Sequence, residues 1–194
     1  LLGIISLSLL MLLLVSANMY LAERGRIEGM SSAQYDVARA IADSHDIDTT
    51  ITKVLATISK NLLWDIGACW RFDHEHDRLI EKAVWCADDK VKDEIFSAAA
   101  ASDQHGELNL QAWNRGESIW LTDLPADSSG RAGRAVKTGM KSGFMLPVYT
   151  DGRISAVFEL YSVRRREPDE RLLETMNTIS SQLGQFIHRR HSED

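Results

Sequence analysis

Residue types that bind metal ions lie close together in one short stretch, Asp73-His74-Glu75-His76-Asp77. Histidine nitrogens and carboxylate oxygens are common zinc ligands, and alternate residues reach the same side only while the chain continues as a strand. This stretch lies between two strand-like segments, where a hairpin must turn and where polar residues are common for that reason alone. We therefore expect a solvated turn and predict no metal site.

The chain has two cysteines, Cys69 and Cys86, each inside an apolar, strand-like stretch. Thiols could serve in redox chemistry or hold a chromophore covalently. If a hairpin turns at 74–77, Cys69 faces Lys82 and Cys86 lies four residues further along that strand, too far for a disulfide. We expect reduced, buried thiols with a structural role, as in a cytoplasmic domain. The alternative is an enzyme that depends on one of them.

A third candidate for chemistry is the carboxylate of Glu159, in the middle of an otherwise apolar stretch, 157–161. A buried carboxylate requires a cationic or hydrogen-bonding partner. Arg131 and Arg134, on a short predicted helix earlier in the chain, could each supply one. The result could be a structural ion pair or a ligand contact at the floor of a pocket. No nucleophile triad, paired-carboxylate spacing or phosphate-binding glycine loop is found, and we assign no catalytic residue.

Glu159 belongs to a predicted hairpin, residues 140–162, that is apolar on both faces. Asp151-Gly152 is a strong signal for a two-residue turn, and counting back from this turn places Phe144 opposite Glu159. An antiparallel sheet with one side in water would show one polar face. Both faces of this hairpin must therefore be covered by other parts of the molecule.

Helical patterns flank the predicted strands. Apolar residues at helical spacing predict helices at 32–44, 48–62 and from Pro168 to about residue 190. Helices from both ends of the chain can pack together on one face of the sheet. The segments between 91 and 138 remain to cover the other face, and such loops and short helices tend to leave a pocket. The candidate pocket residues are Trp85, Trp113, Trp120, Phe144 and Glu159.

The first 22 residues carry no charge and consist mainly of Leu, Ile and Met. A helix of this length would reach about 33 Å, enough to cross a bilayer core. We predict a transmembrane helix at 1–22 rather than a cleaved signal peptide, because no basic region precedes the apolar run. A polar linker at 23–31, a folded domain at 32–190 and a short tail at 191–194 are expected to follow.

Charge restricts the partners of this chain. The net charge of −6 excludes a nucleic-acid partner, because phosphate binding requires a basic face. Arg24 and Arg26 follow the apolar run directly and favour a cytoplasmic location for the residues after it.

Four stretches, 64–70, 113–127, 142–148 and 168–187, resemble the GAF domain family, a sensory fold of many bacterial signalling proteins. Their order and spacing are similar to the family across nearly the whole chain after residue 32. They are most similar to a variant of membrane-associated sensor proteins, often found ahead of a histidine kinase. The resemblance implies an α+β fold in which a six-stranded antiparallel sheet has the terminal helices on one face and a small-molecule pocket on the other.

The resemblance does not assign a cofactor. Bilin-binding relatives often carry Cys followed by His, whereas Trp70 follows Cys69 and Ala87 follows Cys86 here. The signature of cyclic-nucleotide-binding relatives is not present in its usual form either. The ligand is therefore left unknown.

Together these features predict a membrane-tethered sensory or regulatory domain, at the inner membrane with its folded part in the cytoplasm, that is not itself an enzyme. It would bind a small molecule or a partner, pair with a second copy through its terminal helices, and drive an output domain outside this chain. Two alternatives stay open: a ligand-free dimerisation or transmission module, and a thiol-dependent reductase of the methionine sulfoxide type.

Overall fold

The computed structural model of the protein describes residues 2–44, 46–73, 75–76, 78–96, 108–125 and 130–193, with side chains from residue 9 onward except those of 191 and 193. The helices are α1 (Leu2–Ala42), α2 (Ile47–Asn61), α3 (Asp89–Phe96), α4 (Leu108–Arg115), α5 (Gly130–Lys137) and α6 (Glu170–Glu193). The strands are β1 (Ile66–Asp73), β2 (Arg78–Cys86), β3 (Ile119–Leu121), β4 (Ser142–Thr150) and β5 (Arg153–Ser162).

The strands form one antiparallel sheet in the order β2-β1-β5-β4-β3. In the described part of the chain this sheet has five strands, which corrects the expectation of six. The sixth strand was implied by the family resemblance alone. Strand patterns in the sequence account for only five, and after β2 the chain continues into α3 rather than into another strand.

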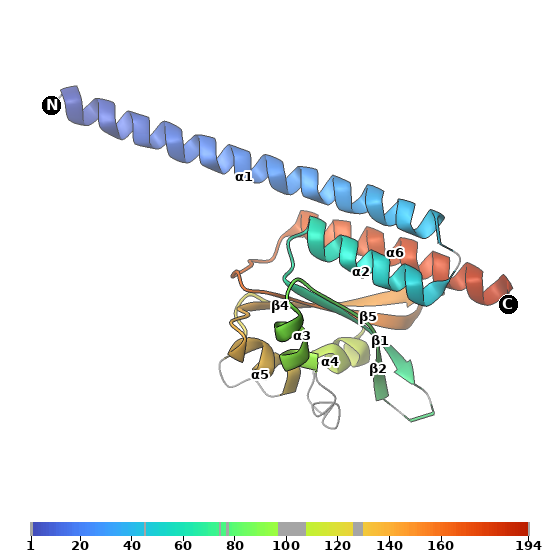
Figure 1. Ribbon diagram of the computed structural model, residues 1–194. Coiled ribbons are helices and arrows are strands. Elements are labelled where there is room, and N and C mark those ends of the chain that lie inside the picture. Colours follow the sequence, from blue (N-terminus) through green and yellow to red (C-terminus); the bar gives the residue numbers. More distant parts are fainter. Residues whose placement is uncertain are drawn as a thin grey trace.

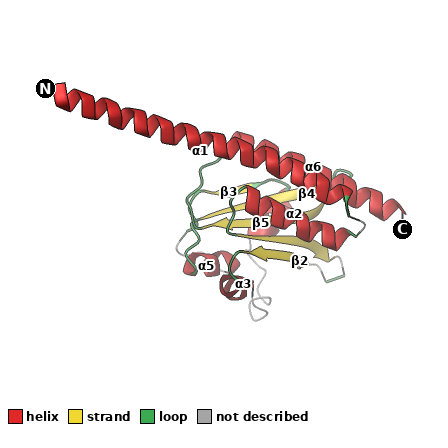
Figure 2. Ribbon diagram, turned by 45° about the horizontal axis from the view of Figure 1, so that its top comes forward, coloured by secondary structure: helices red, strands yellow, loops and turns green. Residues whose placement is uncertain are grey.

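Helices cover both faces of the sheet, so that the fold has three layers. The long helices α1, α2 and α6 lie over one face, and the short helices α3, α4 and α5 lie over the other (Figures 1 and 2). From β4 and β5, Leu146 and Phe158 join the core beneath the long helices, whereas Met145 and Val157 join the core beneath the short ones. The two apolar faces of the hairpin are thus each buried by a separate group of helices.

The hairpin of β4 and β5 turns where the sequence predicts. Asp151 and Gly152 both have positive φ, 53° and 73°, as a two-residue hairpin turn of this type requires. Just after the turn β5 carries one extra residue, Ser155, whose hydroxyl donates to the carbonyl oxygen of Val148 at 3.2 Å. This β-bulge leaves Ser155 without a cross-strand partner.

The bulge changes the register that counting from the turn predicts. Phe144 pairs with Leu160, and Met145 pairs with Glu159. A shift of one residue moves a side chain to the opposite face of a strand. The predicted pairing of Phe144 with Glu159 is therefore wrong, and these two side chains lie on opposite faces of the sheet.

Residues 23–31, predicted as a linker, are helical, because α1 runs through them without a break. Arg24 pairs with Glu28 one turn later at 2.8 Å, an arrangement that supports a helix. Gly29 serves close packing: a Cβ there would lie 2.7 Å from the backbone oxygen of Asn61, at the end of α2. Contacts between α1 and the end of α2 thus begin before residue 32.

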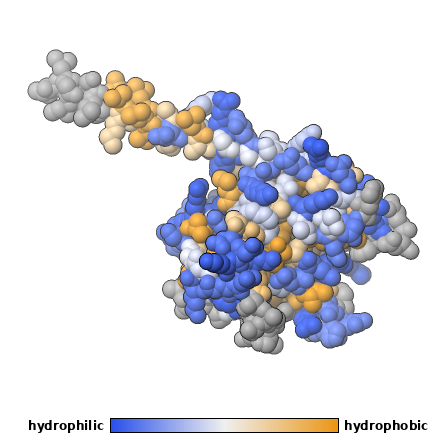
Figure 3. Space-filling view, in the orientation of Figure 1, coloured by the Kyte–Doolittle hydropathy of each residue, from blue (hydrophilic) through white to orange (hydrophobic). Residues whose placement is uncertain are grey.

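The first part of α1 projects from the body of the protein, and apolar side chains gather on it (Figure 3). The large side chains among residues 9–15 and 19–21 are exposed there. Among the described residues, whose side chains begin at residue 9, no helix has the length and apolar character needed to span a membrane, and the transmembrane helix expected at 1–22 is not found there.

We expect Gly29→Ala to lower the free energy of unfolding by about 1–3 kcal/mol, because α1 or the end of α2 must shift to admit the methyl group. Gly25→Ala, one turn earlier in α1, is the control, because a Cβ there meets nothing within 4 Å. This control should leave stability unchanged or raise it by about 1 kcal/mol. Chemical denaturation of the full chain measures both, and equal effects would contradict a close contact at Gly29.

Candidate functional site

The face of the sheet beneath α3, α4 and α5 contains a buried ion pair. Glu159, in the middle of β5, is 0% exposed, and Arg131 of α5 is 4% exposed. Nε of Arg131 donates to both carboxylate oxygens of Glu159, at 3.1 Å and 3.3 Å. The hydroxyl of Tyr161 donates to Oε1 of the same carboxylate at 2.6 Å. Arg131 is thereby confirmed as the partner that a buried Glu159 requires.

The helix α5 holds Arg131 in place over the sheet. Its small residues Ala132 and Ala135 are buried, which brings the helix backbone close to the sheet. Arg134, the other predicted partner of the glutamate, instead donates from Nε to the carbonyl oxygen of Ile95 at 2.8 Å and so joins α5 to α3. Two arginines one turn apart therefore have different roles, one toward the sheet and one toward the neighbouring helix.

Trp70 forms the wall of the site on β1. The guanidinium carbon of Arg131 lies 4.0 Å from the centroid of the Trp70 ring, a close cation–π contact. Phe96 of α3 stacks against the same indole, with ring centroids 6.2 Å apart. The Trp70 Nε1–H is buried and has no hydrogen-bond partner within the described part of the protein. The indole thus offers an unused donor next to a desolvated cation.

Glu81 of β2 pairs with Trp70 in the sheet register and lies at the solvent-exposed rim of the site. Partial withdrawal of its carboxyl from water raises the pKa of Glu81. Lys92 and Arg131 act against this rise, and the nearby charge of Glu159 adds to it. The guanidinium of Arg131 is therefore within the electrostatic reach of two carboxylates. We use the term charged cluster for Arg131, Glu159, Tyr161, Trp70 and Glu81.

Aromatic rings extend this wall beyond the charged cluster. Phe72 of β1 and Trp113 of α4 are stacked with ring centroids 5.0 Å apart and an angle of 12° between their planes. Together with the rings of Trp70 and Phe96 they give this side of the sheet a flat, aromatic character. Such surfaces favour planar groups and cations.

Two of the five predicted pocket residues, Trp113 and Glu159, lie on this face. Trp85, Trp120 and Phe144 pack on the opposite face, in the core beneath α1, α2 and α6. Trp120 pairs directly with Phe144 across β3 and β4, so both follow the register set by the bulge. The structure thus divides the predicted set between the two layers, and the binding role of all five stays a prediction.

Four members of the charged cluster were not among the five predicted pocket residues: Arg131, which was predicted only as a possible partner of Glu159, and Trp70, Tyr161 and Glu81, which were not predicted at all. Tyr161 could have been found, because it follows Glu159 by two residues in a strand and so shares its face. Trp70 and Glu81 lie on other strands, and only the pairing of β1 with β5 and β2 brings them near.

Both thiols are reduced, which confirms that no disulfide joins them. Cys69 pairs with Ala83 rather than the predicted Lys82, because β2 carries an extra residue at a second bulge. Burial raises the pKa of the Cys69 thiol to about 12. Cys86 is less deeply buried, but burial raises its pKa as well. Since the thiolate is the nucleophile, both side chains are weak nucleophiles near neutral pH.

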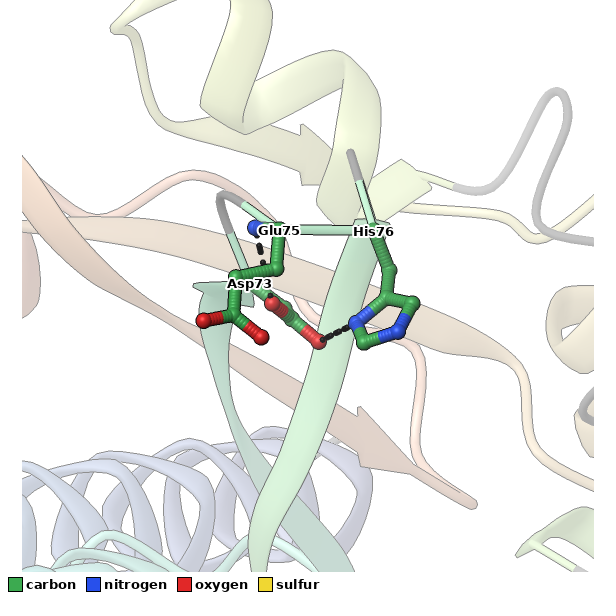
Figure 4. Close-up of side chains that lie close together, drawn as sticks. All are labelled: Asp73, Glu75 and His76. Atoms are coloured by element: carbon green, nitrogen blue, oxygen red, sulfur yellow. Dashed lines mark hydrogen bonds and ion pairs between the residues drawn. The ribbon is translucent and has the colours of Figure 1, made fainter.

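The turn between β1 and β2 brings Asp73, Glu75 and His76 together (Figure 4). Oδ2 of Asp73 lies 2.8 Å from Nδ1 of His76, and its Oδ1 accepts from the backbone N–H of Glu75 at 3.0 Å. The bond to His76 lowers the pKa of the Asp73 carboxyl. Both oxygens thus stabilise the turn itself. His74 and Asp77 lie outside the described residues, and the absence of a metal site stays a prediction.

An arginine-lined cleft of about 440 Å³ lies on the other side of the sheet, between α1, the end of α2 and the start of α6. Arg166 forms part of its wall, with its guanidinium carbon 4.2 Å from the ring centroid of Trp64. The same side chain donates to the carbonyl oxygen of Leu62 at 2.9 Å. Across the cleft, Arg26 of α1 forms an ion pair with Asp169. The charged side chains that line this cleft already pair with neighbouring residues and connect the three helices, so we do not take it as the candidate site.

The family model of the GAF domain matches residues 44–188. A free methionine-R-sulfoxide reductase of Neisseria meningitidis, solved with its substrate, has a TM-score of 0.68 at 16% identity and covers 85% of this chain and 92% of its own. The GAF domain of a phosphoenolpyruvate-protein phosphotransferase of Coxiella burnetii has a TM-score of 0.68 at 14% identity, covering 86% and 96%.

A domain of a protein assigned as a two-component sensor histidine kinase of Sinorhizobium meliloti has a TM-score of 0.59 at 21% identity, covering 77% of this chain and 96% of its own. Comparison with curated proteins found no match. At these identities the solved structures show that the fold is shared, and no more.

We expect Glu159→Gln to lower the free energy of unfolding by about 3–5 kcal/mol, because it removes the carboxylate charge that faces the buried guanidinium of Arg131. Glu81→Gln is the matched control at the exposed rim and should change stability by less than about 1 kcal/mol. Urea denaturation of the two variants and the parent measures the difference. Equal losses would mean that the buried pair has no special role in stability.

Thiol labelling should distinguish the two cysteines. A pKa of about 12 instead of 9.0 reduces the thiolate fraction of Cys69 about a thousandfold at a given pH. In the folded chain at pH 8, Ellman's reagent should therefore modify Cys86 first and Cys69 only after unfolding. Cys86→Ser should remove the reaction of the folded protein, whereas Cys69→Ser should preserve it. Equally rapid labelling of both thiols would contradict the burial of Cys69.

Proposed function

Because the chain belongs to the GAF domain family, we propose that it is a sensory or regulatory domain of a signalling protein, which binds a small molecule at the charged cluster and transmits this event through α1 and α6. The buried pair of Arg131 and Glu159 is the observation that carries the proposal. Apolar side chains of similar size would fill the same space without the cost of desolvating two charges. Desolvated charges beneath short helices are typical of functional sites.

The position of the site on β5 gives a physical route to the terminal helices. Glu159 lies three residues before the end of β5, and the chain then passes through a short loop into α6. The end of the strand is fixed by Asp65, whose carboxylate accepts from the hydroxyl of Ser162 at 2.9 Å and from the backbone N–H of Val163 at 2.9 Å. A displacement of Glu159 would therefore be passed along β5 to this loop.

The start of α6 is in turn attached to α1. Asp169, just before α6, forms the ion pair with Arg26, and Arg171 lies 3.4 Å from Glu23. Trp120 donates from Nε1 to the carbonyl oxygen of Arg166 at 2.7 Å and so holds the loop to the sheet. Ligand binding that shifts β5 would therefore change the angle or contact between α1 and α6. This is a small displacement of packed helices of the kind used in signalling domains.

We propose that an output domain outside this chain receives the signal. We also propose that this chain pairs with a second copy of itself. The fold shared with a domain of a sensor histidine kinase supports a signalling context. Attachment to the inner membrane stays a prediction, and fractionation of cells that express the full-length protein is its test. Dimerisation through the terminal helices is likewise a prediction.

A catalytic role is the weaker proposal, although reductases share this fold. Cys69 lies in the core beneath the long helices, away from the charged cluster. Cys86 borders the core beneath α3–α5, but its sulfur donates to the carbonyl oxygen of Asp88 at 3.0 Å and its pKa is raised by burial. We therefore propose a binding function rather than an enzymatic one.

Native mass spectrometry of the full chain, purified without added ligand, tests the proposal and reports the oligomeric state as well. We expect an adduct that is lost on denaturation, or a saturable increase in Tm with one compound of a metabolite library. The same ligand should bind at least about tenfold more weakly to Glu159→Gln, a loss of about 1.4 kcal/mol, and with unchanged affinity to Glu174→Gln, which lies on the exposed side of α6 outside the charged cluster. A chain without adduct, without any stabilising compound and with unchanged behaviour in Glu159→Gln would contradict a sensor function.

A further inference from the structure

The guanidinium of Arg131 is held as a bound ligand would be held. Its Nε donates hydrogen bonds to both carboxylate oxygens of Glu159, and its central carbon, Cζ, lies 4.0 Å from the centroid of the Trp70 ring. Tyr161 also holds the carboxylate, with a 2.6 Å hydrogen bond to its Oε1. A carboxylate, an aromatic face and a hydroxyl around one flat cation are the elements from which proteins build sites for organic cations.

We propose that the charged cluster is a binding site for a small organic cation with a guanidinium, amidinium or ammonium group, and that Arg131 occupies this site in the ligand-free protein. The inference rests on the proposed function, whose ligand it assigns to a chemical class. Binding would exchange one cation for another against the same carboxylate. The side chain of Arg131 would leave, and the ligand would take its place between Glu159 and Trp70.

The charges at the site favour a cation over an anion. Glu159 is fully buried in the centre of the sheet, paired with Ala68 on β1 and Met145 on β4, and so cannot move aside. An anion that bound Arg131 would have to lie against this carboxylate, and Glu81 adds a second one at the rim. Desolvated like charges at such short range are strongly unfavourable. An incoming cation meets the opposite situation, because two carboxylates attract it.

The rim of the site provides a second position for the displaced arginine. Glu81 lies across from Trp70 on the neighbouring strand and is attracted by Arg131 already in the ligand-free state. An arginine side chain is long enough to turn from an inner to an outer carboxylate while its backbone stays in place. With Arg131 in the site, the buried Nε1–H of Trp70 has no hydrogen-bond acceptor among the described residues. A ligand with an acceptor atom beside its cationic group would satisfy this donor as well.

The test removes the internal cation and supplies it from solution. Arg131→Ala creates a space that matches the arginine head group, and ethylguanidinium is the probe. We expect a saturable increase in the Tm of Arg131→Ala, half-maximal at about 1 mM, which is reasonable for so small a ligand. Sodium chloride at equal ionic strength should not reproduce it. The parent chain, whose site is occupied, should show an increase at least about tenfold smaller at the same concentration.

Two variants make the result specific to this site. Arg134→Ala, one turn along α5, also removes an arginine but should not gain sensitivity to ethylguanidinium. Arg131→Ala combined with Glu159→Gln should lose the response, since the carboxylate that binds the cation is gone. If Arg131→Ala does not fold, Arg131→Val, which retains a γ-carbon and leaves the rest of the space free, takes its place and should respond in the same way to the shorter methylguanidinium. Absence of a response in the folded variant, or an equal response in the double variant, would overturn the cation site.

The outcome is separable from that of the proposed function. If the parent binds a neutral or anionic metabolite while Arg131→Ala ignores ethylguanidinium, the sensor function stands and the cation inference fails. In a second outcome, Arg131→Ala responds to ethylguanidinium, but no organic cation in the library binds the parent at concentrations up to about 10 mM. The cluster can then bind a cation once Arg131 is removed, but the inference that a ligand displaces Arg131 is overturned.

Discussion

A single carboxylate buried at the centre of the sheet determines much of this structure. Glu159 is surrounded by apolar side chains on its own strand and is not accessible to solvent. A charge in this position is stable only with a cation close by, so α5 must lie where Arg131 can reach it. The remaining polar and aromatic groups, Tyr161 and Trp70, complete the surroundings of that pair. The position of α5, and with it the shape of this side of the protein, follows from one requirement for charge compensation.

Two β-bulges decide which side chains share this environment. The extra residue after the β4–β5 turn places Met145 rather than Phe144 beside Glu159, and thereby keeps the phenylalanine ring in the core beneath the long helices. The bulge between β1 and β2 brings Glu81 opposite Trp70. Bulges are frequent near functional sites because they redirect individual side chains without changing the order of the strands. In this protein they separate a face that contains a buried ion pair from a face whose core consists mainly of apolar side chains.

The same strand connects the two faces of the molecule. β5 carries the buried carboxylate in its middle, and its end leads through an arginine-rich loop into α6. That loop is bonded to α1, to the end of α2 and to β3, through Arg26, Leu62 and Trp120 respectively. In the proposed function, a strand that carries the charged cluster at one point and a helix joint at its end is a mechanical link, because packed layers shift as units rather than deform gradually. The domain would then sense at one face and report through its helices.

The sequence by itself determined the type and approximate place of the elements, the location of the β4–β5 turn, the family, and the need of Glu159 for an arginine partner. These features depend on local periodicity, on turn residues and on the cost of burying a charge, which are properties of short segments. The tertiary structure alone decided the register after each bulge, the continuous helix through residues 23–31 and the division of the aromatic residues between the two faces. Register depends on cross-strand contacts between distant segments, and a shift of a single residue reverses the face of a side chain. For this reason the sequence identified Glu159 and Arg131 as partners but predicted the wrong cross-strand pairing for Phe144, which lies opposite Leu160.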